Sequence, residues 1–280
     1  MCEVPLHIQE AGARAGKLGL EHQMPAGDNP LGHIDYNGRL RSFSIVIPAY
    51  NEEQRLPASL DLVRCYLESQ AFDFVEVLVV NDGSRDGTAA IVSEYAARDP
   101  RIRLLENPGN RGKGYAVRHG LTEARGEWVL FTDADLSAPI EELDKLAAAI
   151  GETGADGAIG SRALNRSLVG RHQSLAREIS GRTFNLVMRL VTGLPYLDTQ
   201  CGFKVLNRAA AHAVAARQQS EGFGFDVEIL YIAKKLGFRV VDVPVRWFNA
   251  EGSKVSLWNG MQAFLDPWKV RWNDFKGLYD

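Results

Sequence analysis

Residues 43–52 read FSIVIPAYNE, an apolar and partly β-branched run that ends at a proline and then turns polar. Three further runs have the same apolar character, at residues 74–80, 102–105 and 128–132. Short apolar runs of this kind are typical of parallel strands that are buried on both faces of a sheet. We therefore expect four strands of one sheet in the first half of the chain.

Helical patterns lie between these runs. Apolar residues spaced three or four apart share one face of a helix, and two such sets are Leu56, Leu60, Val63 and Leu67, and Thr88, Ile91, Val92 and Tyr95. Alternating strands and helices predict a doubly wound α/β fold, with a Rossmann-like, mostly parallel sheet flanked by helices. Such sheets bind ligands beyond the carboxyl ends of their strands, so the residues that follow each strand are the candidates for function.

The composition excludes several classes of protein. The 32 Lys and Arg nearly balance the 35 Asp and Glu, for a net charge of −3, which argues against a general nucleic-acid binder. Hydrophobic residues make up 45% of the 280, enough for a globular core. Three scattered cysteines do not form a disulfide framework or a zinc site, so we expect a reducing, cytoplasmic compartment. No apolar run reaches the roughly 18 residues of a membrane-spanning helix, and no signal peptide is expected.

We expect three parts along the chain. Residues 1–40, rich in Gly, His and Pro, are predicted to be a tail or clasp. Residues 41–255 are predicted to form one α/β domain, which includes an appended helical region, a helix near 226–236 and a strand at 239–245. Residues 256–280 form an aromatic, amphipathic segment.

Polar residues follow the first two predicted strands. The Tyr50 ring can stack on a base, and Glu52 can accept hydrogen bonds from a base or ribose, although Asn51 and Glu52 also fit a helix cap. Asp82 at the end of the second strand can reach a nucleobase or ribose, and Gly83 permits a tight turn. An ordinary strand-to-helix turn is the alternative for this second segment.

Asp133 and Asp135 follow the fourth predicted strand. Two carboxylates in an i, i+2 relation at a strand end point to the same side of the sheet. Hard oxygen ligands in this arrangement suit Mg²⁺ or Mn²⁺ bound together with a diphosphate. Asp-x-Asp also occurs in structural roles, but a position in register with Tyr50 and Asp82 favours the metal site.

The turn at residues 110–114, NRGKG, places glycines and two cations before a predicted helix, as in an anion site. It lacks the spacing of a Walker A motif, and no G-x-G-x-x-G turn follows the first strand. These absences count against an NTPase and a dehydrogenase.

Taken together, eight segments resemble glycosyltransferase family 2 with its GT-A nucleotide-sugar fold, and in particular its dolichyl- or polyprenyl-phosphate glucosyltransferases. They occur in family order over about three quarters of the chain, and the sixth and eighth are the most specific to that branch. The segments are residues 46–53 (VIPAYNEE), 81–84 (NDGS), 110–114 (NRGKG), 133–137 (DADLS), 160–162 (GSR), 198–204 (DTQCGFK), 225–228 (FDVE) and 251–254 (EGSK).

The resemblance implies a role for each matching residue. The catalytic set is Asp135, Arg162 and Arg177. The metal set is Asp133 and Asp135, with Mg²⁺ or Mn²⁺ as cofactor. The donor set is Pro48, Ala49, Tyr50, Glu52, Asp82, Gly83, Lys113, Asp133, Ala134, Lys204 and Lys254, of which Lys204 and Lys254 would close over the donor phosphates. The acceptor set is Arg162, Arg171, Arg177 and Gln200.

Two departures from the family pattern matter. Ser137 stands where related mannosyltransferases have Gln, which favours glucose over mannose. The N-terminal membrane helix of the eukaryotic glucosyltransferase is absent, so we expect any membrane attachment to be achieved differently.

Charge and aromatic residues are unevenly distributed. Residues 162–189 hold six arginines and one acid, a local charge of +5 that suits a lipid phosphate, with a solvated surface helix as the alternative. The last 24 residues hold three of the five tryptophans, interspersed with Lys269, Arg271 and Lys276. That composition is typical of a helix in a membrane interface, although Pro267 would break or kink a single helix, and a helix packed on the body or on another subunit is the alternative.

The sequence therefore predicts an inverting, metal-dependent transfer of a hexose, glucose from UDP-glucose, to a polyprenyl phosphate. The expected partners are a UDP-sugar, the polyprenyl phosphate and the cytoplasmic face of a membrane, and no nucleic acid; oligomerisation stays open. The alternatives are a soluble acceptor and a non-catalytic nucleotide-sugar-binding module. The intact Asp133 and Asp135 pair argues against the module.

Overall fold

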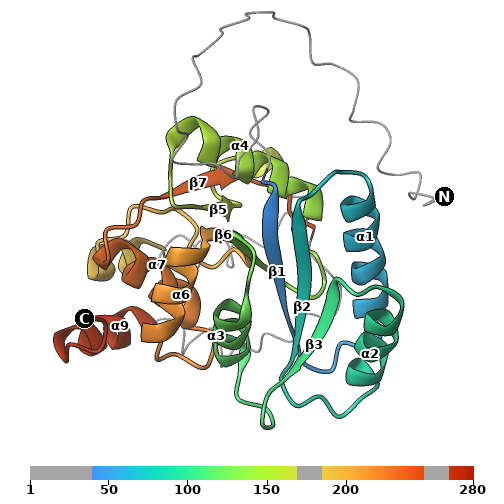
Figure 1. The fold of residues 1–280 in the computed structure, drawn as a ribbon. Coiled ribbons are helices and arrows are strands. Elements are labelled where there is room, and N and C mark those ends of the chain that lie inside the picture. The colour runs from blue at the N-terminus through green and yellow to red at the C-terminus, as the bar shows by residue number, and fades with distance from the viewer. Residues whose placement is uncertain (1–39, 169–184, 249–264) are drawn as a thin grey trace, which may run out of the picture. The chain divides into compact units, whose positions relative to one another are not determined.

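The computed structural model describes residues 40–168, 185–248 and 265–280. In this part of the chain seven strands form one sheet (Figure 1). The strands are β1 (Ser42–Ala49), β2 (Phe74–Asn81), β3 (Ile102–Glu106), β4 (Trp128–Thr132), β5 (Gly157–Ser161), β6 (Phe203–Asn207) and β7 (Val240–Pro244). Their order in the sheet is β3-β2-β1-β4-β6-β5-β7, and β6 alone of these seven runs antiparallel to its neighbours.

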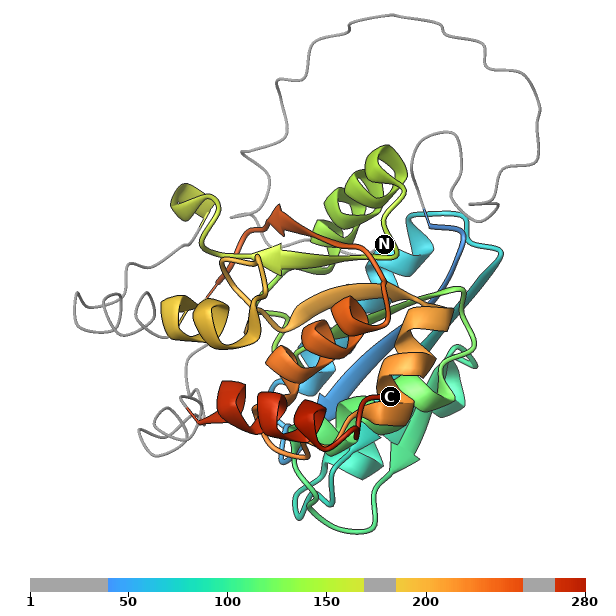
Figure 2. The ribbon, with the colours of Figure 1, turned by 90° about the vertical axis from the view of Figure 1, so that its left-hand side faces the viewer.

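The helices cover both faces of the sheet. They are α1 (Leu56–Glu68), α2 (Thr88–Arg98), α3 (Lys113–Glu123), α4 (Leu143–Thr153), α6 (Arg208–Arg217), α7 (Phe225–Lys235) and α9 (Asp266–Phe275). One core joins α1, α2 and α4 to the sheet, and the other joins α3, α6 and α7 to its opposite face. Helix α9 packs on α7 and contributes Val270 to the second core (Figure 2).

The alternation of side chains along β1 explains these two cores. Phe43, Ile45 and Ile47 enter the first core, whereas Val46 enters the second. All four are fully buried, and each such side chain stabilises the fold by about 1.5–3 kcal/mol relative to an exposed one. The predicted fold, a mostly parallel sheet between helices, is therefore confirmed, as are the four strands of the first half.

Two strands, β5 and β6, were not predicted from the sequence. Strand β5 consists largely of small residues, so it carries little β-propensity. Strand β6 contains Lys204 at a buried position, and a lysine interrupts the apolar pattern by which a buried strand is predicted. The antiparallel direction of β6 has a consequence for function, because it brings residues 198–202 to the edge where β1, β2, β4 and β5 end.

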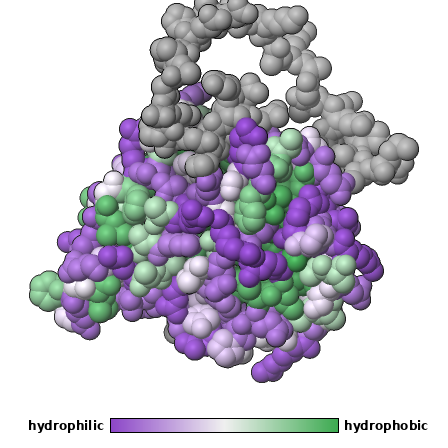
Figure 3. All heavy atoms as spheres, in the orientation of Figure 1, coloured by the Kyte–Doolittle hydropathy of each residue, from purple (hydrophilic) through white to green (hydrophobic). Residues whose placement is uncertain are grey.

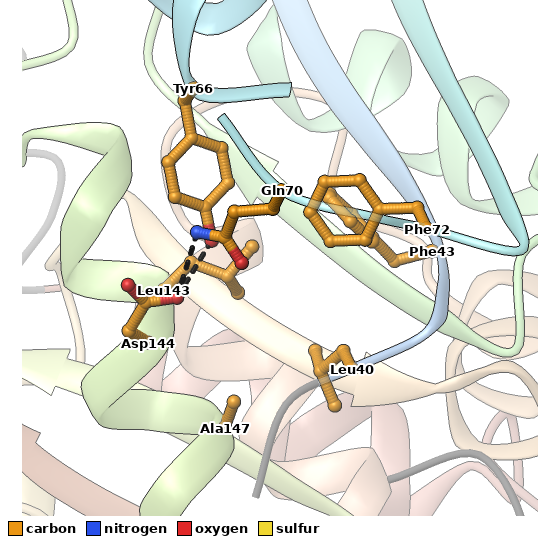
Figure 4. A pocket seen from close by; sticks show the side chains of 8 residues that line it. All are labelled: Leu40, Phe43, Tyr66, Gln70, Phe72, Leu143, Asp144 and Ala147. Carbon is orange, nitrogen blue, oxygen red and sulfur yellow. Dashed lines mark hydrogen bonds between the residues drawn. The ribbon is translucent and has the colours of Figure 1, made fainter. Parts of the chain in front are cut away.

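At the opposite end of the sheet, beside the start of β1, lies a small apolar hollow (Figure 4). Phe43 and Phe72 meet there edge to face, with ring centroids 4.8 Å apart. The Tyr66 hydroxyl donates to Asp144 at 2.8 Å, and Leu40 faces them across the hollow. These contacts pack the start of β1 against α1 and α4.

Candidate active site

The residues predicted from four separate strands meet at one edge of the sheet. Tyr50, Asp82, Asp133 and Arg162 each come directly after a strand, and the four strands point the same way. Pro48 and Ala49 are the last two residues of β1. The topology thus brings these residues to a single edge of the sheet.

A strained turn carries the two aspartates. The Leu136 amide donates to the Asp133 carbonyl at 3.1 Å, and Leu136 has a φ of 45°, in the left-handed region that leucine rarely adopts. The Ser137 amide donates to Oδ1 of Asp135 at 3.0 Å. The Ala134 carbonyl accepts from Ser59 of α1 at 2.7 Å. Backbone strain held in this way concentrates at functional sites.

Asp133 is paired with a cation from the neighbouring helix. Nζ of Lys113, the first residue of α3, lies 2.5 Å from Oδ1 of Asp133. Burial would lower the pKa of Lys113, but Asp133 and Asp226 outweigh it and raise that pKa, so the ammonium stays protonated. Gly202 lies against the same carboxylate, and a Cβ there would collide with it.

The two aspartates fit a divalent cation by their chemistry. Their side chains are 24% and 22% exposed, so both carboxylates are partly accessible to solvent. No group of three or more His, Cys, Asp and Glu side chains suited to a metal occurs within residues 40–168, 185–248 and 265–280. Mg²⁺ is commonly held by only one or two carboxylates, the rest of its shell being water and substrate phosphates. Asp133 and Asp135 provide that donor set.

On the predicted donor side, the Glu52 carboxylate is held by Arg55. Arg55 donates to its carboxylate through Nε and Nη2, both at 2.7 Å, and Nη1 of the same arginine lies 3.8 Å from Asp135. Asn51 has a φ of 53° and accepts from the Arg85 amide at 2.8 Å. Helix α1 begins without a side-chain cap, so the capping interpretation of Asn51 and Glu52 is wrong. Both side chains instead organise the edge of the site.

Asp82 holds the turn at residues 110–114, which we call the glycine turn. Its buried carboxylate accepts from Nδ2 of Asn107 at 2.8 Å and from the amides of Arg111 and Gly112 at 3.0 and 2.7 Å. Gly83 has a φ of 69°, and a Cβ there would lie 2.5 Å from the Gly109 backbone. Asp82 and Gly83 together thus fix residues 107–112 against the end of β2, and this sets the position of Lys113.

Arg162 forms the basic side of the site. Its amide, Nε and Nη2 donate to the Asp198 carboxylate at 3.0, 2.7 and 2.8 Å, and its guanidinium stacks 4.8 Å from the centre of the Trp247 ring. Burial would raise the pKa of Asp198, but Arg162 outweighs it, and the pKa lies below its ordinary value. A rigid, always charged guanidinium therefore stands at the end of β5.

Lys204 does not lie where it was expected. It was predicted to close over donor phosphates, but it is fully buried in β6 and donates to the Cys201 carbonyl at 2.7 Å. It forms an ion pair with Asp226, whose pKa burial raises in spite of Lys204 and Lys113. A side chain enclosed within a central strand cannot move over a ligand, so Lys204 supports the floor of the site.

The structure also brings together residues that sequence reasoning passed over. Arg55, Leu136, Asp198 and Trp247 all shape the site. Leu136 and Asp198 lie in quoted segments but were given no role, and Arg55 and Trp247 lie outside those segments. A positive φ or a stacking partner 85 residues away leaves no local signal in a sequence. Gln200 is half-buried just before β6, at the site edge.

Three predicted residues lie outside the described residues, namely Arg171 and Arg177 of the acceptor set and Lys254 of the donor set. Of the arginine-rich stretch, Arg162 lies in a loop and residues 166–168 form a short 3₁₀ turn. Residues 185–192 are helical, with Leu186 and Leu190 exposed. The described part is therefore not one continuous helix from Arg162.

The sequence profile of the family described as "Glycosyl transferase family 2" matches residues 44–214, more than half of the chain. The chain belongs to glycosyl transferase family 2. It is a glycosyltransferase with a GT-A fold, as the sheet topology and its structural relatives indicate. The match ends within α6, so it includes Asp82, Asp133, Asp135 and Arg162.

Relatives in this family are similar over most of the chain. The dolichyl-phosphate beta-glucosyltransferase of Drosophila melanogaster is 39% identical, over 81% of this chain and 73% of the relative. The human dolichyl-phosphate beta-glucosyltransferase is 33% identical, over 85% of this chain and 78% of the relative. A solved glucosyl-3-phosphoglycerate synthase from Mycobacterium tuberculosis, in complex with Mn²⁺, UDP and glucosyl-3-phosphoglycerate, has a TM-score of 0.59 at 20% identity, over 89% of this chain and 86% of that one. The chain is thus a family 2 glycosyltransferase similar to the dolichyl-phosphate glucosyltransferases.

Proposed function

We propose that this glycosyltransferase transfers a glucosyl residue from UDP-glucose to a dolichyl or polyprenyl phosphate, with inversion at the anomeric carbon. The observation that carries the proposal is the pairing of two accessible carboxylates, Asp133 and Asp135, with a fixed cation, Arg162, at one edge of the sheet. A nucleotide diphosphate with its metal suits the first group, and a phosphate acceptor suits the second. The names of the relatives supply the same donor sugar and acceptor class.

The donor is proposed to lie across the ends of β1, β2 and β4. Tyr50 would stack on the uracil, and Glu52 would meet the base or ribose on the surface that Arg55 holds in place. Asp133 and Asp135 would hold Mg²⁺ or Mn²⁺, which when bound neutralises charge on the leaving diphosphate. Lys113 lies beside Asp133 and would face the same phosphates.

The acceptor phosphate is its own nucleophile. The second pKa of a phosphate monoester is about 6, so the group is largely dianionic at neutral pH and needs no dedicated base. One phosphate oxygen attacks the anomeric carbon from the face opposite the diphosphate. A carbon–oxygen bond to the acceptor forms, the bond to the diphosphate oxygen breaks, and UDP leaves with that electron pair.

Arg162 orients this acceptor in the proposal. A guanidinium has five N–H donors in a planar fork. Nε of Arg162 and one N–H of its Nη2 donate to Asp198, and the other donors can contact a phosphate. Because the carboxylate and Trp247 hold the group in one orientation, little side-chain entropy is lost when a phosphate binds. Arg171 and Arg177 are proposed as further acceptor contacts from the sequence alone.

The proposed acceptor is a lipid, so we place the enzyme at the cytoplasmic face of a membrane, as a peripheral protein. None of the described helices has the length and apolar character that crossing a bilayer requires. The oligomeric state does not enter the proposal.

A panel of labelled nucleotide sugars tests the donor and acceptor together. The purified protein with Mg²⁺ or Mn²⁺ is supplied with UDP-glucose, UDP-galactose or GDP-mannose, with and without a polyprenyl phosphate. We expect label to move into the organic phase only with UDP-glucose and the lipid phosphate together. Transfer only to water-soluble acceptors, such as 3-phosphoglycerate, would replace the lipid acceptor by a soluble one.

A further inference from the structure

We infer that the outer face of α9 binds to the headgroup region of a lipid bilayer. The inference rests on the proposed function, because the bilayer would present the lipid acceptor to the site. The outer face consists of Leu265, Trp268, Trp272 and Phe275, the last three of which lie on α9 and the first directly before it. Their spacing of three and four residues places them along one side of the helix.

Helix α9 buries the side opposite to its aromatic residues. Pro267 and Val270 are buried toward the body, and Tyr279 just beyond the helix is fully buried. Trp268 and Trp272 are instead 60% and 57% exposed, and Phe275 is 82% exposed. Apolar residues accordingly emerge at the left-hand edge of the molecule, over α9 (Figure 3). A soluble helix normally has the reverse arrangement, so this apolar side requires a partner.

Cations accompany these rings. Nζ of Lys276 lies 5.2 Å from the centre of the Trp272 ring, which stacks on Phe275 at 5.8 Å between centroids. Lys269 is exposed and follows Trp268 in the sequence. Nζ of Lys269 lies 3.7 Å from Oδ1 of Asp266. Tryptophan together with lysine is the composition of helices that lie in the headgroup region of a membrane, where the rings enter the interface and the ammonium groups meet phosphates.

One loop and one turn connect the outer face of α9 to the candidate active site. A hollow separates α9 from the loop at residues 219–224, and Trp272 and the half-exposed Phe223 line it. On its other side this loop touches the glycine turn, because the Tyr115 amide donates to the Glu221 carbonyl at 3.1 Å and Arg111 pairs with the Glu221 carboxylate at 2.6 Å. That turn ends at Lys113, the partner of Asp133. A bilayer on α9 would therefore lie beside the glycine turn that leads into the site.

The charge of the face favours a bilayer over a second copy of the chain. Lys269 and Lys276 complement anionic headgroups, whereas a second copy seated symmetrically on the same face would bring the same lysines to it again. Insertion of a few aromatic rings into the headgroup region also needs no complementary protein surface.

Flotation with lipid vesicles tests the inference without any substrate. The full chain is mixed with vesicles of phosphatidylcholine, or of phosphatidylcholine with phosphatidylglycerol, at low and at physiological salt. We expect it to float with both, and more with the anionic vesicles. Replacing Trp268, Trp272 and Phe275 together by Ser should weaken binding to both by tenfold or more, since the apolar contacts are lost. Replacing Lys269 and Lys276 by Glu should abolish only the preference for anionic vesicles.

The control is Leu62→Ser on α1, a similarly exposed apolar residue whose helix covers the other face of the sheet, and it should float like the wild type. Turnover of a short, water-soluble polyprenyl phosphate should be unchanged in the triple Ser variant. The inference is overturned if the wild type does not float, or if the triple variant floats equally well. It is also overturned if sedimentation shows a dimer that the triple variant dissociates, because a second copy then covers the face. An absence of transfer by the wild type to any acceptor, with flotation intact, would instead contradict the proposed function.

Discussion

Nζ of Lys113 and Oδ1 of Asp133 lie 2.5 Å apart, joining the first residue of α3 to the turn that follows β4. The same ammonium also interacts electrostatically with Asp226, which is paired with Lys204 in the floor of the site. Lys113 therefore stands at the junction of the surface carboxylates and the buried ion pair. Several consequences of this arrangement are measurable.

Lys113→Met should separate metal binding from catalysis. Without the ammonium, Asp133 loses its directly paired cation, so we expect Mn²⁺ alone to bind more tightly than to the wild type, as measured by electron paramagnetic resonance. With donor and acceptor present, kcat/KM should fall by about 10²-fold, because a cation near the diphosphate is lost. Weaker Mn²⁺ binding with unchanged turnover would contradict this role.

Asp135→Ala should abolish most of the activity even at saturating metal. We expect kcat to fall by about 10²–10³-fold, the usual loss when one electrostatic contact to developing charge is removed. Asp144→Ala is the matched control, since Asp144 lies at the other end of the sheet beside Tyr66. Near-normal turnover of the Asp135 variant would remove this carboxylate from the mechanism.

Arg162→Lys tests the acceptor side. Lysine can neither form the two-pronged contact with Asp198 nor stack on Trp247 in the same way. We expect KM for the polyprenyl phosphate to rise at least tenfold, with a smaller change in KM for UDP-glucose. A change confined to the donor would assign Arg162 to the other substrate.

The buried pair of Lys204 and Asp226 should behave as a unit. Lys204→Met leaves a buried carboxylate without its partner, and such losses cost about 3–5 kcal/mol in the free energy of unfolding. The double variant Lys204→Met, Asp226→Leu should recover most of that loss, as a double-mutant cycle in urea would measure. Additive losses would mean that the two side chains contribute independently.

Glu76 should account for part of the acid sensitivity of the fold. Burial alone would raise its pKa, but hydrogen bonds from the Arg125 amide, Ser44 and Arg103 lower it below the ordinary 4.5. A lowered pKa means that the folded state binds fewer protons than the unfolded state. The stabilisation is therefore complete above about pH 4.5 and is lost as the pH falls through the folded-state pKa. In urea unfolding, Glu76→Gln should show a shallower loss of stability on acidification than the wild type, and an equal slope would refute this assignment.

Much of the fold and the site followed from local pattern. The strand run at 43–48 and the Asp-x-Asp turn were predictable because burial on both faces and a polar strand end leave a signature within a few residues. Strand β6 was not predictable in this way. Lys204 is a polar residue in the sequence, and the partner that neutralises its charge, Asp226, is 22 residues away. Asp82 was identified by position, but its bonds to the glycine turn depend on a loop 25 to 30 residues later. Contacts between distant segments carry no local signal.

The most direct test is the transfer of label from UDP-glucose to a short polyprenyl phosphate by the purified protein with Mg²⁺ or Mn²⁺. The proposed function predicts an organic-soluble glucosyl phospholipid, formed in equal amount to the UDP released and lost in the Asp135→Ala variant. The matching polyprenyl alcohol, which lacks the phosphate nucleophile, should accept nothing. Equal transfer to the alcohol, or UDP release that does not depend on the lipid phosphate, would contradict the proposal.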